Sequence, residues 1–502
     1  SQARWSRDVN GVRMVQLIVT SDAADRQMAA LRAEVTRLGG SVAVVHTGFR
    51  SLTITLPASR VASLSRHPDV LSVTPNRTTQ HVASTVETIT GSVASGIRTY
   101  STATTYSGYD GTGVGIAILD SGVMKAHKSF LNAAGATRVK RNVNMLNSTM
   151  YNWSNINDPN MSPEPGSSWL TSYETSVAAD SAVTQDPYGH GTHVAAVAAG
   201  RGFYQTPDST GVAPNANLYD VRVLNDQGFG TISDALEGIN WVMYHAREYN
   251  IRVMNVSLAA ASTDSWQDDP LCTAVRAASA MGITVVTAAG NFGLNLQGKK
   301  VYGSVAAPGN DPTVITVGAS NFKATTARTD DVVTNFSSRG PTRGKAYDAA
   351  DRVVRDNILK PDLVAPGNKI VSALATQALA ATPTKNKLAT LYPSLVTAAG
   401  GPTTYSQQLM MLSGTSIAAP VVAGAAAVLL QANPGLTPPL VKAILQYTAQ
   451  PLPSYNLLEQ GAGQLNLEGA VRLATALRTD IRTAVEAGTL VHGSTALLAS
   501  GK

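Results

Sequence analysis

The first eighty residues alternate between strand-like and helix-like hydrophobic spacing. The strand-like stretches are Val12–Val19, Ser41–His46, Ser51–Leu56 and Val70–Thr74. Helical spacing runs over Asp25–Leu38, where two glycines follow as a stop signal. The apolar face of this helix consists of Met28, Leu31, Val35 and Leu38. With a short helix around Val61–Leu64, the β-α-β-β-α-β order predicts a small α+β sandwich of the ferredoxin-like kind.

Longer apolar runs in the remainder of the chain predict buried strands and closely packed helices. Val114–Leu119 and Ile283–Ala289 have the length and composition of buried parallel strands. Val194–Gly200 and Ile417–Leu430 are rich in alanine and glycine, as expected of helices packed tightly into a core. The second part of the chain is therefore expected to be an α/β domain.

Composition fits a compact enzyme of two or more domains. The 502 residues exceed one ordinary core, and charged residues make up only 14%. A single cysteine, Cys272, excludes an intrachain disulfide. The longest apolar run, Ala418–Leu430, is too short to span a bilayer, so no membrane partner is expected.

The formal charge of +6 is unevenly distributed. Residues 1–82 hold ten arginines and five acidic residues, whereas the remainder holds 29 basic and 28 acidic residues. The near neutrality of the larger part argues against a nucleic-acid-binding surface.

Three short glycine-containing motifs supply a carboxylate, an imidazole and a hydroxyl. Asp120, His190 and Ser416 each lie at a bend beside an apolar segment. Together they can activate a serine nucleophile, and Asp-His-Ser is one of three known chain orders for such a triad. Taken singly, Ser416 could be a helix N-cap, Asp120 a turn residue, and His190 with His193 half of a zinc site.

The flanking residues resemble the subtilisin-like serine proteases. The resemblance rests on Ile118–Gly122, Gly189–His193, Ser413–Pro420, Ile283–Asn291, Asn335–Pro341 and Lys360–Gly367. It implies a three-layer fold with a mostly parallel sheet, and a serine endopeptidase that acts through an acyl-enzyme. By the same resemblance Asn291 donates to the oxyanion, while His190 is the base and His193 is structural.

The resemblance also implies where substrate binds. Asn255–Leu258 resembles the edge strand that pairs with the substrate backbone, so that Ser257, Leu258 and Ala259 are substrate-binding. Ala288, Ala289 and Gly290 are expected to form one wall of the S1 pocket, with residues 305–307 as another. No acidic residue is evident there, which favours an apolar or broad P1 preference.

Residues 1–82 resemble the inhibitory propeptide that precedes many subtilisin-like enzymes. Thr79–Val82 then corresponds to the tail that lies in the cleft, and self-cleavage is expected at the Val82–Ala83 bond. Residues 83–113 would be a linker and the start of the mature enzyme, 114–475 the catalytic domain, and 476–502 a tail of unknown role. An unrelated ferredoxin-like binding module is the alternative for the N-terminal part.

Four departures from the family pattern affect the expected properties. The usual methionine after the nucleophile is Ile417, which predicts tolerance to peroxide. Ala259–Ala260 replaces glycines and is expected to narrow the pocket for the fourth residue before the scissile bond. Residues 142–186 are expected to form a surface loop near the cleft. Residues 201–211 replace an asparagine-rich calcium loop, which leaves structural calcium possible but unassigned.

A secreted bacterial endopeptidase, self-processing and monomeric, is the leading interpretation. Its expected partners are polypeptide substrates and its own N-terminal propeptide, and no cofactor is required for the chemistry. A catalytically silent binding protein with the same fold is the main alternative. A small-molecule esterase or amidase would carry Gly-x-Ser-x-Gly, which residues 414–418 lack, and acid peptidases with a Ser-Glu-Asp triad have no place for His190.

Overall fold

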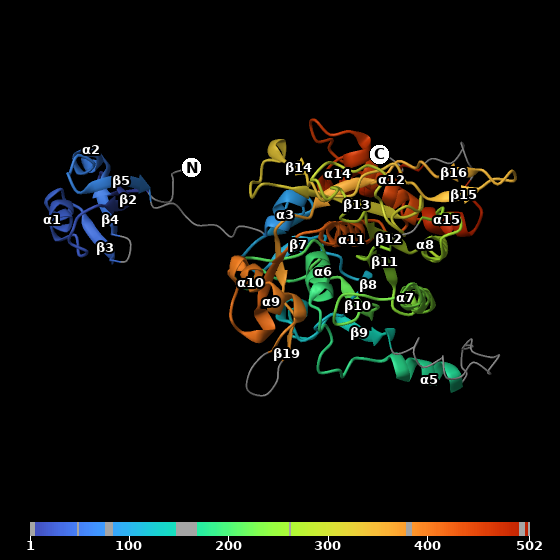
Figure 1. Ribbon diagram of the computed structural model, residues 1–502. Helices are drawn as coiled ribbons and strands as arrows, with labels where there is room; N and C mark the ends of the chain where they lie inside the picture. Colours follow the sequence, from blue (N-terminus) through green and yellow to red (C-terminus); the bar gives the residue numbers. More distant parts are fainter. Residues whose placement is uncertain are drawn as a thin grey trace. The chain divides into compact units, whose positions relative to one another are not determined.

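The computed structural model describes residues 6–47, 50–75, 84–146, 168–260, 263–377, 384–490 and 497–499 (Figure 1). The chain divides into two compact units, Ser1–Val82 and Ala83–Lys502. Each unit has hydrophobic core clusters of its own, and each is described by itself.

The first unit is an antiparallel sheet covered by two helices. Its strands are β1 (Ser6–Val9), β2 (Val12–Ser21), β3 (Ser41–His46), β4 (Ser51–Pro57) and β5 (Val70–Pro75), and its helices are α1 (Ala29–Arg37) and α2 (Val61–Leu64). Strand β2 is central: it pairs with β4 on one side and with β1 and β5 on the other, while β3 pairs with β4. The predicted ferredoxin-like order is confirmed, and β1 is an additional strand.

Helix α1 buries the predicted apolar face, but it begins later than expected. All four residues of that face are at most 7% exposed. The helix begins at Ala29 rather than Asp25, because the Asp25 carboxylate accepts hydrogen bonds from the N–H groups of Gln27 and Ala29. This local turn occupies the residues in which the first helical turn was predicted.

The second unit is built on an eight-stranded, mostly parallel sheet, as predicted. The strands are β8 (Gly115–Asp120), β9 (Val139–Asn144), β10 (Asn217–Arg222), β11 (Ile251–Val256), β12 (Thr284–Ala288), β13 (Ile315–Asn321), β14 (Val332–Val333) and β17 (Leu363–Pro366). They follow the order β14-β13-β12-β11-β8-β10-β9, with β17 also paired to β13. Only the β13–β14 pairing is antiparallel.

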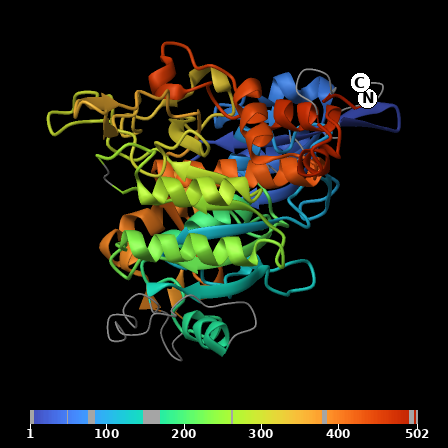
Figure 2. The same cartoon turned by 90° about the vertical axis from the view of Figure 1, so that its right-hand side faces the viewer.

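Helices cover both faces of this sheet and make the three layers (Figures 1 and 2). Helices α6 (His190–Ala199) and α11 (Thr415–Ala432) pack on one face, and α7 (Ile232–His245) and α8 (Pro270–Ala280) on the other. Strand β8 therefore alternates between two cores: Ile116 and Ile118 join the first cluster, Ala117 and Leu119 the second. Burial on both faces explains why β8 lacks polar positions before its last residue.

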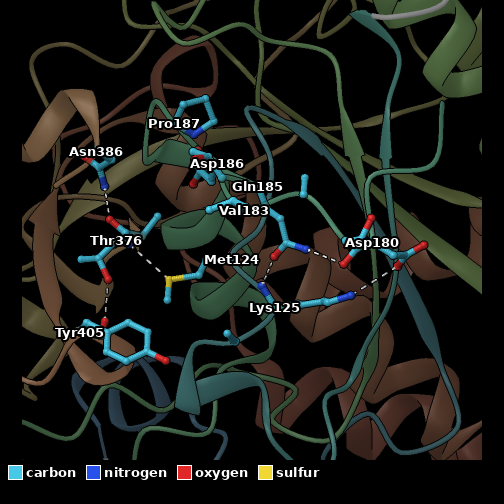
Figure 3. Close-up of a pocket in the computed structure, with 15 residues that line it drawn as sticks. Met124, Lys125, Asp180, Val183, Gln185, Asp186, Pro187, Thr376, Asn386 and Tyr405 are labelled. Carbon is cyan, nitrogen blue, oxygen red and sulfur yellow. Dashed lines mark hydrogen bonds and ion pairs between the residues drawn. The ribbon is translucent and has the colours of Figure 1, made fainter. Parts of the chain in front are cut away.

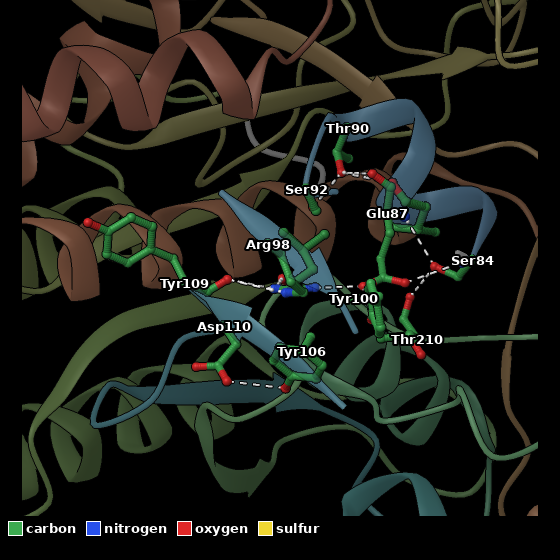
Figure 4. A network of polar contacts seen from close by, with 12 residues as sticks. Ser84, Glu87, Thr90, Ser92, Arg98, Tyr100, Tyr106, Tyr109, Asp110 and Thr210 are labelled. Atoms are coloured by element: carbon green, nitrogen blue, oxygen red, sulfur yellow. Dashed lines mark hydrogen bonds and ion pairs between the residues drawn. The ribbon is translucent and has the colours of Figure 1, made fainter. Parts of the chain in front are cut away.

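Residues 84–113, expected to be a linker and the start of the mature enzyme, are a folded part of the second unit rather than a free linker. Helix α3 (Thr85–Thr90) and the hairpin of β6 (Arg98–Tyr100) and β7 (Tyr106–Gly108) surround a buried ion pair (Figure 4). The Arg98 guanidinium lies 2.6 Å from the Glu87 carboxylate, and both side chains are fully buried. Arg98 also donates to the carbonyls of Tyr109 and Val212.

Other expected loops also contain regular structure. Within residues 142–186, helix α5 (Ser168–Val177) packs on α7, where His245 contacts the carboxylates of Glu174 and Glu248 at 2.9 Å each. Residues 147–167 lie outside the described residues. The C-terminal part includes α15 (Ile481–Glu486), whose Ile481 is buried in the main core.

A long excursion separates β18 (Ile370–Ala373) from its antiparallel partner β21 (Leu409–Leu412). It contains β19 (Thr376–Gln377), β20 (Thr384–Lys385), α9 (Lys387–Leu391) and α10 (Pro393–Ala399). Among the described residues, α11 alone is long and apolar enough to cross a membrane. Most of this helix, 83%, is buried inside the second unit.

Candidate active site

Asp120, His190 and Ser416 meet at the carboxyl edge of the large sheet. Asp120 is the last residue of β8, His190 the first of α6, and Ser416 the second of α11. His190 Nδ1 lies 2.8 and 2.9 Å from the two Asp120 oxygens, and its Nε2 lies 2.9 Å from Ser416 Oγ. Because Nδ1–H donates to the carboxylate, Nε2 presents a lone pair to the serine hydroxyl.

Opposing effects act on the protonation of His190. Burial disfavours the imidazolium, but the charge and hydrogen bond of Asp120 outweigh it, so the pKa of His190 is raised above its usual value. The carboxylate of Asp186 raises this pKa further. The imidazole is therefore a stronger base than a free histidine.

Asp186 and Ser121 hold the chain around His190, although the sequence analysis did not identify them. The Asp186 carboxylate accepts the backbone N–H groups of Gly189 and Thr192 at 2.7 and 2.8 Å. The Ser121 hydroxyl donates to Asp186 and accepts the N–H of Gly191. An acidic residue shortly before a helix that begins at His190 is the sequence signal that could have identified Asp186.

Asn291 lies across from Ser416, with its amide orientation defined by Thr415. The backbone N–H and the hydroxyl of Thr415 donate to Asn291 Oδ1 at 2.9 and 3.0 Å. The Thr415 hydroxyl also accepts the N–H of Gly290. Since Oδ1 is occupied, Asn291 Nδ2 is the end of the amide available to a ligand.

Gly414 leaves open a space that is surrounded by the Ser416 hydroxyl, the Asn291 amide and the backbone N–H of Ser416. A Cβ atom on Gly414 would lie 2.9 Å from Ser416 Oγ, 3.5 Å from Asn291 Nδ2 and 3.7 Å from the Ser416 nitrogen. The Ser416 N–H is among the first four of α11, which lack partners within the helix. An anionic oxygen placed there would meet two N–H donors and the positive end of the helix dipole.

The predicted substrate-binding segments converge beside Ser416, with one correction. Asn255 belongs to β11, which lies inside the sheet between β8 and β12, so it is not on an edge strand. The chain leaves the sheet at Ser257, whose hydroxyl donates to the Ser416 carbonyl at 2.9 Å. Beyond it, Ala260 pairs with Ala307 through two backbone hydrogen bonds.

The predicted S1 walls are neighbours in the structure. The N–H of Ala306 donates to the Ala289 carbonyl at 3.2 Å, next to buried Ala288 and to Gly290. Phe292 is half exposed, and its ring would lie 3.1 Å from a Cβ on Gly290. This aromatic side chain, one residue after Asn291, was not foreseen; it lies beside Gly290 of the predicted S1 wall.

A cavity of about 340 Å³, here called the Tyr188 cleft, extends from His190 along residues 257–260. Its other lining residues are Tyr188, Val223, Leu224, Gly228, Phe229, Gly230, Thr231, Ile232, Ala235 and Leu271. Leu258, Ala259 and Ala260 all line it, and the narrowing expected from the two alanines stays a prediction. Most of the lining side chains are apolar.

His193 and Ile417, which the sequence analysis singled out beside the triad, are both buried. His193 Nε2 lies 3.1 Å from the Ile370 carbonyl and 3.2 Å from that of Met410. Burial lowers the pKa of His193 to about 3, so the ring is neutral and donates from Nε2. Ile417, directly after Ser416, is fully buried.

Structural calcium stays unassigned around residues 201–211. The Ser84 hydroxyl donates to the Thr210 carbonyl at 2.6 Å, and Arg98 donates to the Val212 carbonyl at 2.7 Å. These two carbonyl oxygens are hydrogen-bonded within the chain, whereas a calcium ion needs about six to eight oxygen ligands. In the described part of the chain, no group of three or more His, Cys, Asp or Glu side chains is arranged to hold a metal.

The predicted cleavage residues Val82 and Ala83 lie outside the described residues. The boundary between the two compact units falls between them. The first described residue after the boundary, Ser84, caps α3 through a reciprocal capping box with Glu87.

Comparison with known proteins identifies both parts of the chain. The family model described as "Subtilase family" matches residues 111–470, and the one described as "Putative peptidase inhibitor domain" matches residues 2–76. The chain is 37% identical to "Serine protease AprX" of Bacillus subtilis (strain 168) over 292 residues, which are 57% of this chain and 58% of that protein. It is 31% identical to "Subtilisin Savinase" of Lederbergia lenta over 58% of this chain and 80% of that protein.

A solved structure, "Crystal structure of a cold adapted subtilisin-like serine proteinase", is 26% identical, with a TM-score of 0.42 and coverage of 71% of this chain and 88% of that one. The subtilase model alone covers well over half of the chain, and it includes all three residues of the Asp-His-Ser arrangement. The chain belongs to the subtilase family.

Proposed function

We propose that this protein is a serine endopeptidase that hydrolyses polypeptides through an acyl-enzyme. The single observation that carries the proposal is the continuous hydrogen-bonded path from Asp120 through His190 to the Ser416 hydroxyl. Membership of the subtilase family supports it. The alternative of a catalytically silent binding protein is disfavoured, because all three triad residues are present and hydrogen-bonded to one another.

In this mechanism His190 Nε2 takes the proton of Ser416 as Oγ attacks the scissile carbonyl carbon. The carbonyl oxygen becomes anionic and binds Asn291 Nδ2 and the Ser416 N–H in the space beside Gly414. The imidazolium, stabilised by Asp120, then donates its proton to the leaving amine, and the acyl group stays on Ser416. Water, deprotonated by the same imidazole, hydrolyses the ester and regenerates the enzyme.

An apolar or broad P1 preference is proposed from the residues expected to line the S1 pocket. The two segments proposed as its walls, residues 288–290 and 305–307, are apolar and hydrogen-bonded to each other, and the Phe292 ring lies beside Gly290. Neither segment contains an acidic residue that could pair with lysine or arginine. A panel of peptide substrates with different P1 residues tests this preference.

Residues 1–82 are proposed to be an inhibitory propeptide that the enzyme removes by cutting the Val82–Ala83 bond. The match to a peptidase inhibitor domain over residues 2–76 supports this role. The boundary between the two compact units falls at the same bond, so a cut there would divide neither unit. The enzyme is further proposed to be secreted by a bacterium and to act as a monomer, and its bacterial relatives support the first point.

Active-site labelling tests the endopeptidase proposal. A fluorophosphonate reacts with a serine only where a neighbouring base activates it, so the wild type is expected to gain one label on Ser416. His190→Ala should react far more slowly, and Ser413→Ala, three residues away, should react normally. Peptide mapping by mass spectrometry gives the site. The proposal would be contradicted by a label distributed over several serines, or by labelling of His190→Ala at the same rate as the wild type.

A further inference from the structure

Helix α5 packs against α7 with little apolar burial. Among the α5 side chains that the structure describes, only Val177 is fully buried, while Tyr173 and Glu174 are partly exposed. Two side chains of α7 bind the Glu174 carboxylate: His245 Nε2 lies 2.9 Å from one oxygen, and Trp241 Nε1 donates to the other at 3.4 Å. The position of α5 therefore depends strongly on the polar contacts of Glu174.

The His245 ring lies between two carboxylates. Its Nε2 faces Glu174 of α5, and its Nδ1 lies 2.9 Å from Glu248 Oε2, just after α7. An ionised carboxylate accepts hydrogen bonds and donates none, so both contacts are hydrogen bonds only when each ring nitrogen carries a hydrogen. This geometry fits the imidazolium and neither neutral tautomer.

Loss of one ring hydrogen weakens the attachment of α5 in either tautomer. With the remaining hydrogen on Nδ1, a lone pair of Nε2 faces the Glu174 carboxylate, and the two repel. With the hydrogen on Nε2, a hydrogen bond from a neutral ring replaces a charge-assisted one, which is roughly twice as strong. In that tautomer the lone pair of Nδ1 faces Glu248 instead.

The surroundings of His245 favour its charged form. The side chain is only 7% exposed, and the ring centroids of Trp241 and Tyr249 lie 4.5 and 5.0 Å from its own. Burial disfavours the imidazolium, but the hydrogen bonds and charges of Glu174 and Glu248 outweigh it. The pKa of His245 is therefore raised above its usual value of 6.5.

The other titratable or charged groups around this contact are glutamates, tyrosines and an arginine. Such side chains ordinarily titrate well below or well above the range of histidine. They are Tyr173 on α5, Glu237 and Tyr244 on α7, Tyr249 after it, Arg141 on β9 and Tyr219 on β10. His245 is thus the group whose charge changes near neutral pH at the α5–α7 contact.

We propose that His245, Glu174 and Glu248 form a proton-operated latch that docks α5 on α7 and releases it when His245 loses a proton. Because the docked form binds this proton more tightly, docking is strongest below pH 6.5 and weakens as the pH rises through the raised pKa of His245. Release opens residues 168–177 to solvent and to proteases. The inference does not depend on the proposed endopeptidase function.

The segment between α5 and His190 is held by contacts of its own (Figure 3). Gln185 Nε2 donates to the Asp180 carbonyl at 3.2 Å, and Gln185 Oε1 accepts the N–H of Lys125 at 2.9 Å. The Lys125 ammonium also lies 3.9 Å from the Asp180 carboxylate. Release is therefore expected to stay confined to α5 and to leave the chain around His190 in place.

Hydrogen–deuterium exchange of the full chain carrying Ser416→Ala tests the latch without self-digestion. Uptake by peptides that cover residues 168–177 is followed from about pH 5.5 to about pH 9 and corrected for the intrinsic exchange rate. We expect the corrected rate to rise by about threefold or more over this range, because docking weakens as His245 is deprotonated. Peptides from residues 180–189 and from α14 (Leu467–Ala476) should show no such rise.

Two variants of this parent chain separate the latch from general loosening. His245→Phe keeps an aromatic ring in the stack but cannot be charged, so α5 should exchange fast at both ends of the pH range. Glu174→Gln removes the carboxylate from a partly exposed position of α5 and should reduce the rise by about half or more. His46→Phe, which removes a histidine of the first unit, is the matched control and should keep the full rise.

An uptake that does not change with pH in the parent chain, or the same rise in His245→Phe as in the parent, would overturn the inference. If His245→Phe does not fold, Glu174→Gln decides alone, and an undiminished rise in that variant would overturn it.

Discussion

At the scale of single residues, the candidate site depends on groups that receive their positions from distant parts of the chain. Thr415 orients the amide of Asn291, from which it is separated by 124 positions in the sequence. The three triad residues were predictable because each lies in a distinctive motif. Thr415 was not predictable, since its role depends on a contact with a distant residue that no local pattern records. Asp186 had a local signal, its place shortly before the helix that begins at His190, and this signal was missed.

Gly414→Ala should impair catalysis without unfolding the protein. The added methyl carbon would lie 2.9 Å from Ser416 Oγ, in the space proposed for the oxyanion. We expect kcat to fall by about 10²-fold, the size of effect measured for loss of an oxyanion donor in a subtilisin, which is a relative. Steady-state kinetics measure the effect, and circular dichroism verifies the fold. An unchanged kcat would contradict the placement of the oxyanion.

The pH profile should report the raised pKa of His190. Below that pKa the imidazolium already holds a proton on Nε2 and cannot accept one from Ser416, so kcat/KM falls as the pH decreases. We expect the midpoint of this acid limb above 6.5, the usual value for histidine. Asp186→Asn removes a charge that raises this pKa and should move the midpoint to lower pH. A midpoint below 6.5 in the wild type would contradict the assignment.

Peroxide should leave the wild type active and inactivate Ile417→Met. The residue after the nucleophile is fully buried, and isoleucine has no sulfur to oxidise. In the variant, oxidation to the sulfoxide would place a polar oxygen beside Ser416. Residual activity after timed exposure, together with peptide masses, measures both effects. Equal losses in the two proteins would show that another residue is the sensitive one.

At the scale of elements, hydrophobic spacing predicted most strands and helices of the first unit within a few residues. Strand β1 was missed because its residues Ser6, Arg7 and Asp8 are polar or charged and have no apolar alternation. The excursion between β18 and β21 was also missed. Its strands are only two residues long, too short to show an alternation of apolar and polar positions, and they are defined only by pairing with each other.

The buried pair of Arg98 and Glu87 should contribute strongly to the stability of the second unit. Arg98→Met leaves the Glu87 carboxylate buried without its counter-charge, so we expect a loss of about 3 kcal/mol in the free energy of unfolding. The control is Arg482→Met, which breaks the exposed pair with Glu486 and should cost less than about 1 kcal/mol. Denaturant unfolding of the Ser416→Ala background avoids self-digestion. Equal losses would contradict a structural role for the buried pair.

At the scale of the whole molecule, the chain divides into two compact units at the bond that is proposed to be cut. The prediction of a small α+β unit before a mostly parallel α/β unit is confirmed in architecture. The inhibitory role of the first unit stays a prediction. It depends on an interaction between the units that sequence patterns within each of them do not encode.

Self-processing tests the central claim most directly, because substrate and enzyme are the same chain. The wild type and Ser416→Ala are incubated side by side, with intact mass and casein hydrolysis followed over time. We predict that the wild type separates at or near the Val82–Ala83 bond and gains activity, while the variant stays whole and inactive. Cleavage of the variant at the same rate, or a wild type that stays intact and inert, would contradict the account.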